Sequence, residues 1–107
     1  MVAVNCAYPF VTADEKGRWQ VLWQDNRYGA WGTYSSASVD GVKWSPSSRV
    51  SDALSHESGW INPKTMKHDE FLGDYNSIAA AYGQLFATWV DTRNGASQVF
   101  FSAAPNP

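Results

Sequence analysis

The chain has 107 residues, of which 17% are charged and 15% are aromatic, including six tryptophans. This length corresponds to one domain, and the aromatic content supplies enough apolar surface for a core, which excludes a disordered tail. The formal net charge of −2 provides no basic surface for nucleic acid, and no apolar run approaches the ~18 residues that a membrane-spanning helix needs. Residues 1–6 are too short and too polar for a signal peptide. The lone cysteine, Cys6, excludes an internal disulfide, and we expect it to be a buried strand residue.

The first half of the chain alternates short β-patterned runs with polar turns that contain glycine. Trp19, Val21 and Trp23 alternate with more polar neighbours, which is the period of a strand with one buried face. Strands are expected at 2–7, 10–13, 19–24, 33–38 and 49–52. The first of these is expected to stop at Pro9, and no stretch of ten residues keeps a helical period.

The second half repeats the first at an offset of 66 residues. Trp89 to Gly95 repeats Trp23 to Gly29, and further equivalences place Ala79 on Ala13 and Gly83 on Gly17. Three strands are therefore expected in this copy, at 76–81, 85–90 and 98–103. A fixed internal period indicates a repeat architecture, here a twofold one.

The first copy thus has four expected strands and the second only three. Val4 to Ala7 resembles Val50 to Ala53, which forms the fourth strand of the first copy. We therefore interpret residues 2–7 as the fourth strand of another copy. Residues 54–74, between the copies, form either a functional loop or a surface excursion whose Trp60 and Phe71 pack back onto the sheet.

Four-stranded repeating units are typical of β-propeller blades. The turn from Ser38 to Trp44 resembles the Asp-box of sialidases and other BNR-repeat proteins. In such a turn Asp40 accepts hydrogen bonds from backbone amides, Gly41 supplies a positive φ angle, and Trp44 tucks under the hairpin. Residues 23–27, 71–75 and 89–95 also look like blade segments of bacterial sialidase-like proteins.

This resemblance implies an all-β fold with two four-stranded antiparallel propeller blades. The expected organisation is a strand at 2–7, a first blade at 8–53, a connecting loop at 54–74 and a second blade at 75–104. Two blades leave large apolar faces exposed, so we expect identical chains to close a six-bladed ring, with a trimer favoured. Residues 2–7 would complete the incomplete blade of the neighbouring chain. The resemblance also implies an extracellular or periplasmic location.

True sialidases use three arginines, a Tyr–Glu nucleophile pair and an aspartic acid/base. Here Tyr8-Pro9-Phe10 stands where an early Arg-Ile-Pro motif normally supplies the first arginine. Tyr75, beside Asp74 and Glu70, is the nearest match to the nucleophile pair. We therefore predict no catalytic residues. The alternative is an exo-sialidase or related glycosidase site that is complete only in the assembled ring.

An Asp-x-Arg pair occurs in both copies, as Asp25 with Arg27 and as Asp91 with Arg93. Residues two apart in an extended chain point to one side, so each pair can form an ion pair or bind loop backbone groups. Arg27 could also stack on a neighbouring tryptophan. Recurrence in both copies favours a structural role, and a ligand-facing role is the alternative.

In a propeller, the loops that follow the second and fourth strands of each blade share one face. We therefore expect Arg27, Arg93, Trp60 and Tyr75 to bind a glycan or another small anionic or polyhydroxylated ligand there, with the Asp-box on the opposite face. A purely structural fragment without a ligand is the remaining alternative. His56 and His68 have no third partner of the kind that zinc requires, so no metal and no cofactor are predicted.

Overall fold

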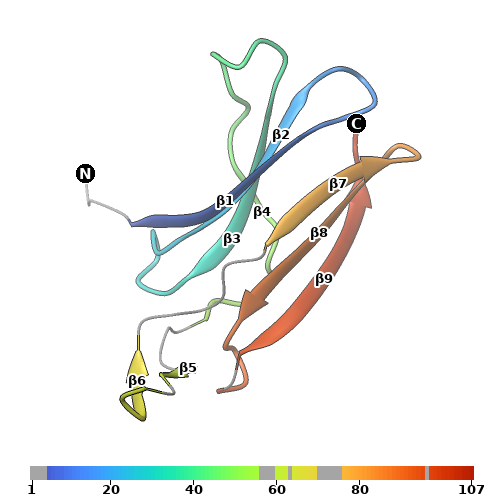
Figure 1. Cartoon of the computed structure of the whole chain (residues 1–107). Helices are drawn as coiled ribbons and strands as arrows, with labels where there is room; N and C mark the ends of the chain where they lie inside the picture. Colours follow the sequence, from blue (N-terminus) through green and yellow to red (C-terminus); the bar gives the residue numbers. More distant parts are fainter. Residues whose placement is uncertain (1–4, 56–59, 63, 70–75, 96) are drawn as a thin grey trace.

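A computed structural model describes residues 5–55, 60–62, 64–69, 76–95 and 97–107. Within these residues all regular structure is β, which confirms the predicted class (Figure 1). The first sheet contains, in spatial and chain order, β1 (Cys6–Ala13), β2 (Trp19–Asp25), β3 (Gly32–Ser38) and β4 (Ser48–Arg49). The second sheet contains β7 (Ser77–Ala81), β8 (Gln84–Asp91) and β9 (Gln98–Pro105). All neighbouring strands are antiparallel.

The start of the first sheet differs from the prediction. β1 runs through Pro9, with a register shift between Ala7 and Phe10, and Cys6 pairs with Asp25. Such a bulge accommodates a proline, which has no N–H to give to a strand ladder. Cys6 and Ala7 therefore belong to this chain's own first sheet, whereas residues 2–4 lie outside the described part. Cys6 is also exposed, so the expectation of a buried thiol is wrong.

The two copies differ by one residue in the turn that follows their first strand. Ala13 pairs with Trp19, but the residue that pairs with Leu85 is Ala80. The counterpart of Ala13 is thus Ala80, not Ala79, and the offset is 80 − 13 = 67 in this strand. The second turn is shorter because Tyr82 and Gly83 both take positive φ angles, as a two-residue hairpin turn requires.

The segment between the sheets also departs from the expected loop. It contains a short antiparallel hairpin of β5 (Trp60–Asn62) and β6 (Lys67–Asp69), in which Trp60 pairs with Asp69. Phe71 and Tyr75 lie outside the described residues. No helix that could cross a membrane is found in the part of the chain that the structure describes.

The cross-strand pairs assign the side chains of each main sheet to one of two faces, which we call front and back. The front face of the first sheet carries Val11, Trp19, Val21, Trp23 and Tyr34, and that of the second carries Ile78, Leu85, Ala87, Trp89 and Phe100. The back face of the first sheet carries Gln20, Leu22, Gln24, Thr33 and Ser35, and that of the second carries Phe86, Thr88, Val90, Val99 and Phe101.

The second sheet packs its front face onto the back face of the first. Leu22 is fully buried there, in one cluster with Ile78, Ala87 and Trp89. Gln24 adds a polar clamp, since its Nε2 atom donates to the Val90 carbonyl at 2.9 Å. The contact between the sheets is therefore head-to-tail: unlike faces of two similar units meet.

A second polar link joins the first turn to the end of the chain. The enclosed carboxylate of Asp14 accepts hydrogen bonds from Arg18 Nε (2.9 Å), Gln20 Nε2 (2.9 Å) and Asn106 Nδ2 (3.2 Å). Burial alone would raise the pKa of Asp14, but the hydrogen bonds from Gln20, Arg18 and Asn106 outweigh it and hold the pKa far below its ordinary value. This cluster stabilises the packing of both sheets at one end.

Candidate functional site

The repeated Asp-x-Arg pair of the first sheet is the centre of a four-residue cluster. Asp25 accepts hydrogen bonds from Trp23 Nε1 at 2.9 Å and from Arg27 Nε and Nη2 at 2.9 and 2.6 Å. The Arg27 guanidinium lies 3.8 Å from the centre of the Tyr34 ring. The predicted pairing is confirmed, but the cation stacks on Tyr34 instead of on a tryptophan. The reason is the strand register, which places Tyr34 directly opposite Trp23.

The second sheet builds the same cluster from the equivalent residues. Asp91 accepts from Trp89 Nε1 at 3.1 Å and from Arg93 Nη2 at 2.7 Å, and Arg93 lies 3.9 Å from the centre of the Phe100 ring. Arg93 also binds Asp52 of the first copy at 2.5 Å. The second arginine therefore joins its own hairpin to the neighbouring sheet.

Electrostatics in these clusters favour the ionised pair. Burial would raise the pKa of Asp25, but the hydrogen bonds from Arg27 and Trp23 outweigh it and lower the pKa. The carboxylates of Asp91 and Asp52 raise the pKa of Arg93. Each guanidinium thus remains charged and is held in place by carboxylates of this chain.

The predicted ligand-binding residues are only partly brought together. Figure 1 shows the β2–β3 loop, the β8–β9 loop and the β5–β6 hairpin at one end of the molecule, so Arg27, Arg93 and the backbone of Trp60 share that end. Tyr75 lies outside the described residues. Because carboxylates occupy much of both guanidinium groups, ligand binding by Arg27 and Arg93 stays a prediction.

The Asp-box turn lies at the opposite end of the first sheet (Figure 1). Asp40 Oδ1 accepts hydrogen bonds from the amides of Val42 (2.8 Å) and Lys43 (2.9 Å), and Gly41 has a φ of 76°. These contacts agree with the expected turn chemistry, and Ser38 Oγ accepts a further bond from the Gly41 amide. Trp44, however, keeps 43% of its surface exposed and is no buried anchor.

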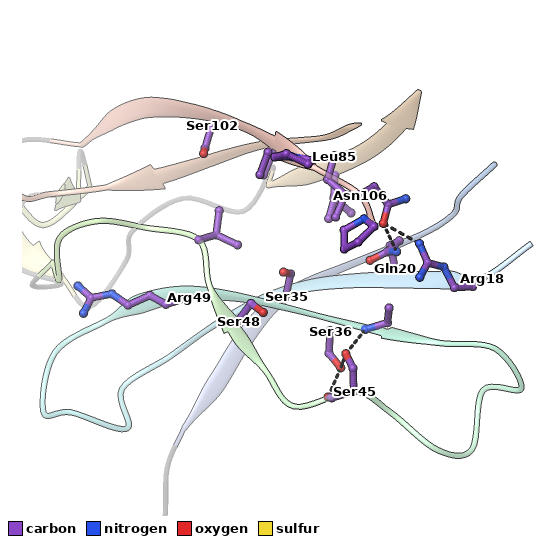
Figure 2. A pocket seen from close by; sticks show the side chains of 17 residues that line it. Arg18, Gln20, Ser35, Ser36, Ser45, Ser48, Arg49, Leu85, Ser102 and Asn106 are labelled. Carbon is purple, nitrogen blue, oxygen red and sulfur yellow. Dashed lines mark hydrogen bonds between the residues drawn. The ribbon is translucent and has the colours of Figure 1, made fainter. Parts of the chain in front are cut away.

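A cavity of about 490 Å³ lies between the two sheets, and the sequence did not predict it (Figure 2). On the side of the first sheet it is lined by Gln20, Ser35, Ala37, Ser48 and Arg49; on the side of the second by Ile78, Leu85, Ala87, Ser102 and Ala104. The sequence signal was available: serine and alanine occupy positions 35, 37, 102 and 104, where facing strands leave space.

Serine hydroxyl groups line the cavity, and Arg49 lies at its edge. Among the described residues, the side chains of Ser35, Ser48 and Ser102 have no hydrogen-bond partner. Arg49 uses its Nε atom to donate to the Ser51 carbonyl at 2.8 Å, and no described residue binds its two Nη groups. Arg49 pairs with Tyr34 across β3 and β4, so it belongs to the front face of the first sheet, and Figure 2 shows its guanidinium pointing away from the labelled serines of the cavity. Arg18, which binds Asn106, lies at the other end of the cavity (Figure 2).

The described residues offer no candidate metal centre. No group of three or more histidine, cysteine, aspartate or glutamate side chains comes close enough together there to hold an ion. His56 and the side chain of His68 lie outside what the structure describes. The absence of a metal site therefore stays a prediction for the whole chain.

Comparisons with known proteins add no relative. No family model, no curated protein and no solved structure matches this chain.

Proposed function

We propose that this chain is a binding module, built from two sialidase-like propeller blades, for a glycan or another small anionic or polyhydroxylated ligand. The observation that supports this proposal is the cavity between the sheets, where the hydroxyl groups of Ser35, Ser48 and Ser102 have no hydrogen-bond partner in the described part of the chain. Its volume of about 490 Å³ falls within the ~300–1,000 Å³ that is usual for small-molecule sites.

The chemistry of the two walls suits such a ligand. Ser35 and Ser48 can donate to or accept from sugar hydroxyl groups. The Arg49 Nη groups point away from the cavity, so they can bind only a carboxylate that extends past its edge. The opposite wall, with Leu85 and Ala87, is apolar and suits the C–H face of a pyranose ring. A monosaccharide suits both walls, and the carboxylate of an acidic one would lie at the edge of the cavity to reach Arg49.

The end of the molecule that carries Arg27 and Arg93 is the other candidate location, because the sequence motifs recur there. The two arginines are already bound to Asp25 and Asp91, so the cavity is the better supported place. A ligand at the loop end would have to share the guanidinium groups with these carboxylates.

Amide chemical shifts distinguish the two locations. In a titration with N-acetylneuraminic acid, we expect shifts at Ser35, Ser48 and Ser102, and weaker shifts with a neutral hexose. Shifts confined to Arg27 and Arg93 would move the site to the loop end. No shift with any sugar would favour a structural unit without a ligand.

Two variants with the same change in charge test the role of Arg49. Arg49→Gln should weaken binding of the acid by roughly tenfold or more, because one charge-assisted hydrogen bond contributes ~1.5–3 kcal/mol. Lys43→Gln, in the exposed turn, should leave the affinity unchanged. Equal losses in the two variants would show a general charge effect and contradict the assignment. Turnover of a fluorogenic sialoside would favour the glycosidase alternative.

A further inference from the structure

Two sheet faces of this chain pack against no other sheet among the described residues. They are the front face of the first sheet and the back face of the second. Within the chain, a front face already packs on a back face, with Leu22 and Trp89 in its core. The two open faces are therefore the two complementary halves of a contact that the fold already makes once.

Both open faces carry exposed apolar side chains. On the back of the second sheet, Val99 is 73% and Phe101 is 63% exposed; on the front of the first sheet, Val11 is 54% and Trp19 is 47% exposed. Phe86 stacks beside Phe101, with ring centres 6.2 Å apart, and extends the first of these patches. Contiguous apolar surface of this kind marks an interaction site.

We propose that a second copy of this chain covers each open face, with the back of the second sheet docking onto the front of the next copy's first sheet. The contact is heterologous and repeats the one between the two sheets, and we expect its rotation to be one that closes into a ring. Three copies would give the six blades expected from the sialidase resemblance. This inference does not depend on the proposed ligand.

Residue differences between the back faces of the two sheets favour a second copy of this chain as the partner that covers the open faces. The second sheet has Phe86, Val90 and Phe101 where the first sheet has Gln20, Gln24 and Ser35. The internal contact can rely on polar clamps because its two sheets are covalently joined. A contact between separate chains must also offset the entropy of association, and larger apolar side chains supply that energy.

The contact needs no exchange of strands. Cys6 and Ala7, which were expected to complete a neighbour's sheet, pair with β2 of their own chain. The neighbour instead contributes a face, and the front-face residue Val11 would lie against Val99 or Phe101 of the adjoining copy.

The mass of the particle in solution, measured by light scattering, tests this geometry. The wild-type chain should give three times its mass of 11.8 kDa. Val11→Asp blocks one face and Phe101→Asp blocks the other, so each variant alone should fall to the mass of one chain. Tyr82→Asp is the matched control, because Tyr82 is 92% exposed in a turn away from both faces, and it should keep the wild-type mass.

Mixing the two blocked variants makes the test specific. Each still has one intact face, so an equimolar mixture should form a two-chain complex that cannot grow, which also shows that both variants are folded. A folded wild-type monomer would overturn the proposal. So would loss of assembly in Phe101→Asp but not in Val11→Asp, because that result indicates two back faces packed symmetrically.

Discussion

Replacing Asp14 by alanine is expected to destabilise the fold strongly, because the enclosed carboxylate is the shared acceptor of one polar cluster. The variant loses hydrogen bonds from Arg18, Gln20 and Asn106 and leaves those donors without their acceptor. Removing one partner from a buried ion pair typically costs about 3–5 kcal/mol. Against a typical total of ~5–15 kcal/mol, this change should bring the protein close to unfolding.

Asn106→Ala removes one donor to the Asp14 carboxylate and the Oδ1 acceptor of Arg18 Nη2, but it keeps the bonds from Arg18 Nε and Gln20 to Asp14. Because the ion pair between Asp14 and Arg18 remains, this variant should be the milder one. In the double variant the two effects should not add, since both residues share the Asp14 carboxylate. Urea unfolding at one fixed protein concentration measures all three values, because the proposed assembly would make apparent stability depend on concentration.

The pH dependence has a definite sign. The pKa of Asp14 is depressed in the folded protein, so the stabilisation is complete above the unfolded-state pKa of about 3.9 and is lost as the pH falls toward the folded-state pKa. The difference between wild type and Asp14→Ala should therefore shrink from pH 7 to pH 3, by at most about 1.3 kcal/mol. A difference below about 1 kcal/mol at pH 7, or one that grows in acid, would refute this account.

Three further perturbations follow from the two copies. Tyr34→Phe should leave the urea midpoint unchanged or raise it, because the buried Tyr34 hydroxyl has no hydrogen-bond partner among the described residues. The second copy has Phe100 at the equivalent position. A clear loss of stability would show that the hydroxyl has a partner outside the described residues. Asp25→Ala should cost about 3–5 kcal/mol, since it leaves Arg27 unpaired, and an unchanged midpoint would contradict the role of the cluster. Asp40→Ala should lower the midpoint without changing sugar affinity in a titration, and the reverse pattern would place the Asp-box in the binding site.

Much of the fold could be predicted because its signals are local. The alternation at Trp19, Val21 and Trp23 predicted β2, and the repeat transferred that assignment to β8. The Asp25–Arg27 pair followed from its recurrence, since a device that occurs in both units serves the unit itself. The aromatic partner of Arg27, Tyr34, could not be predicted from the two-residue spacing of Asp25 and Arg27, because its position beside Arg27 depends on the register of the hairpin.

The features that escaped prediction depend on contacts between distant residues. Asp14 and Asn106 are 92 positions apart, and no pattern along the chain connects them. The cavity depends on the depth at which the second sheet packs on the first. The run of alanines from Ala79 to Ala81 gave no cue to register, so the one-residue difference between the turns became visible only in the pairing of the strands.

The repeated aromatic–arginine clusters also bear on the order of folding. Each cluster lies within one hairpin: Trp23 and Tyr34 are 34 − 23 = 11 residues apart, and so are Trp89 and Phe100. Closing so short a loop loses little entropy, and isolated hairpins form in about 1–10 μs. Each half of the chain therefore carries its own nucleus, which can form before the sheets meet. Refolding should show an early phase that is independent of protein concentration. If the proposed ring forms, a later phase should depend on protein concentration.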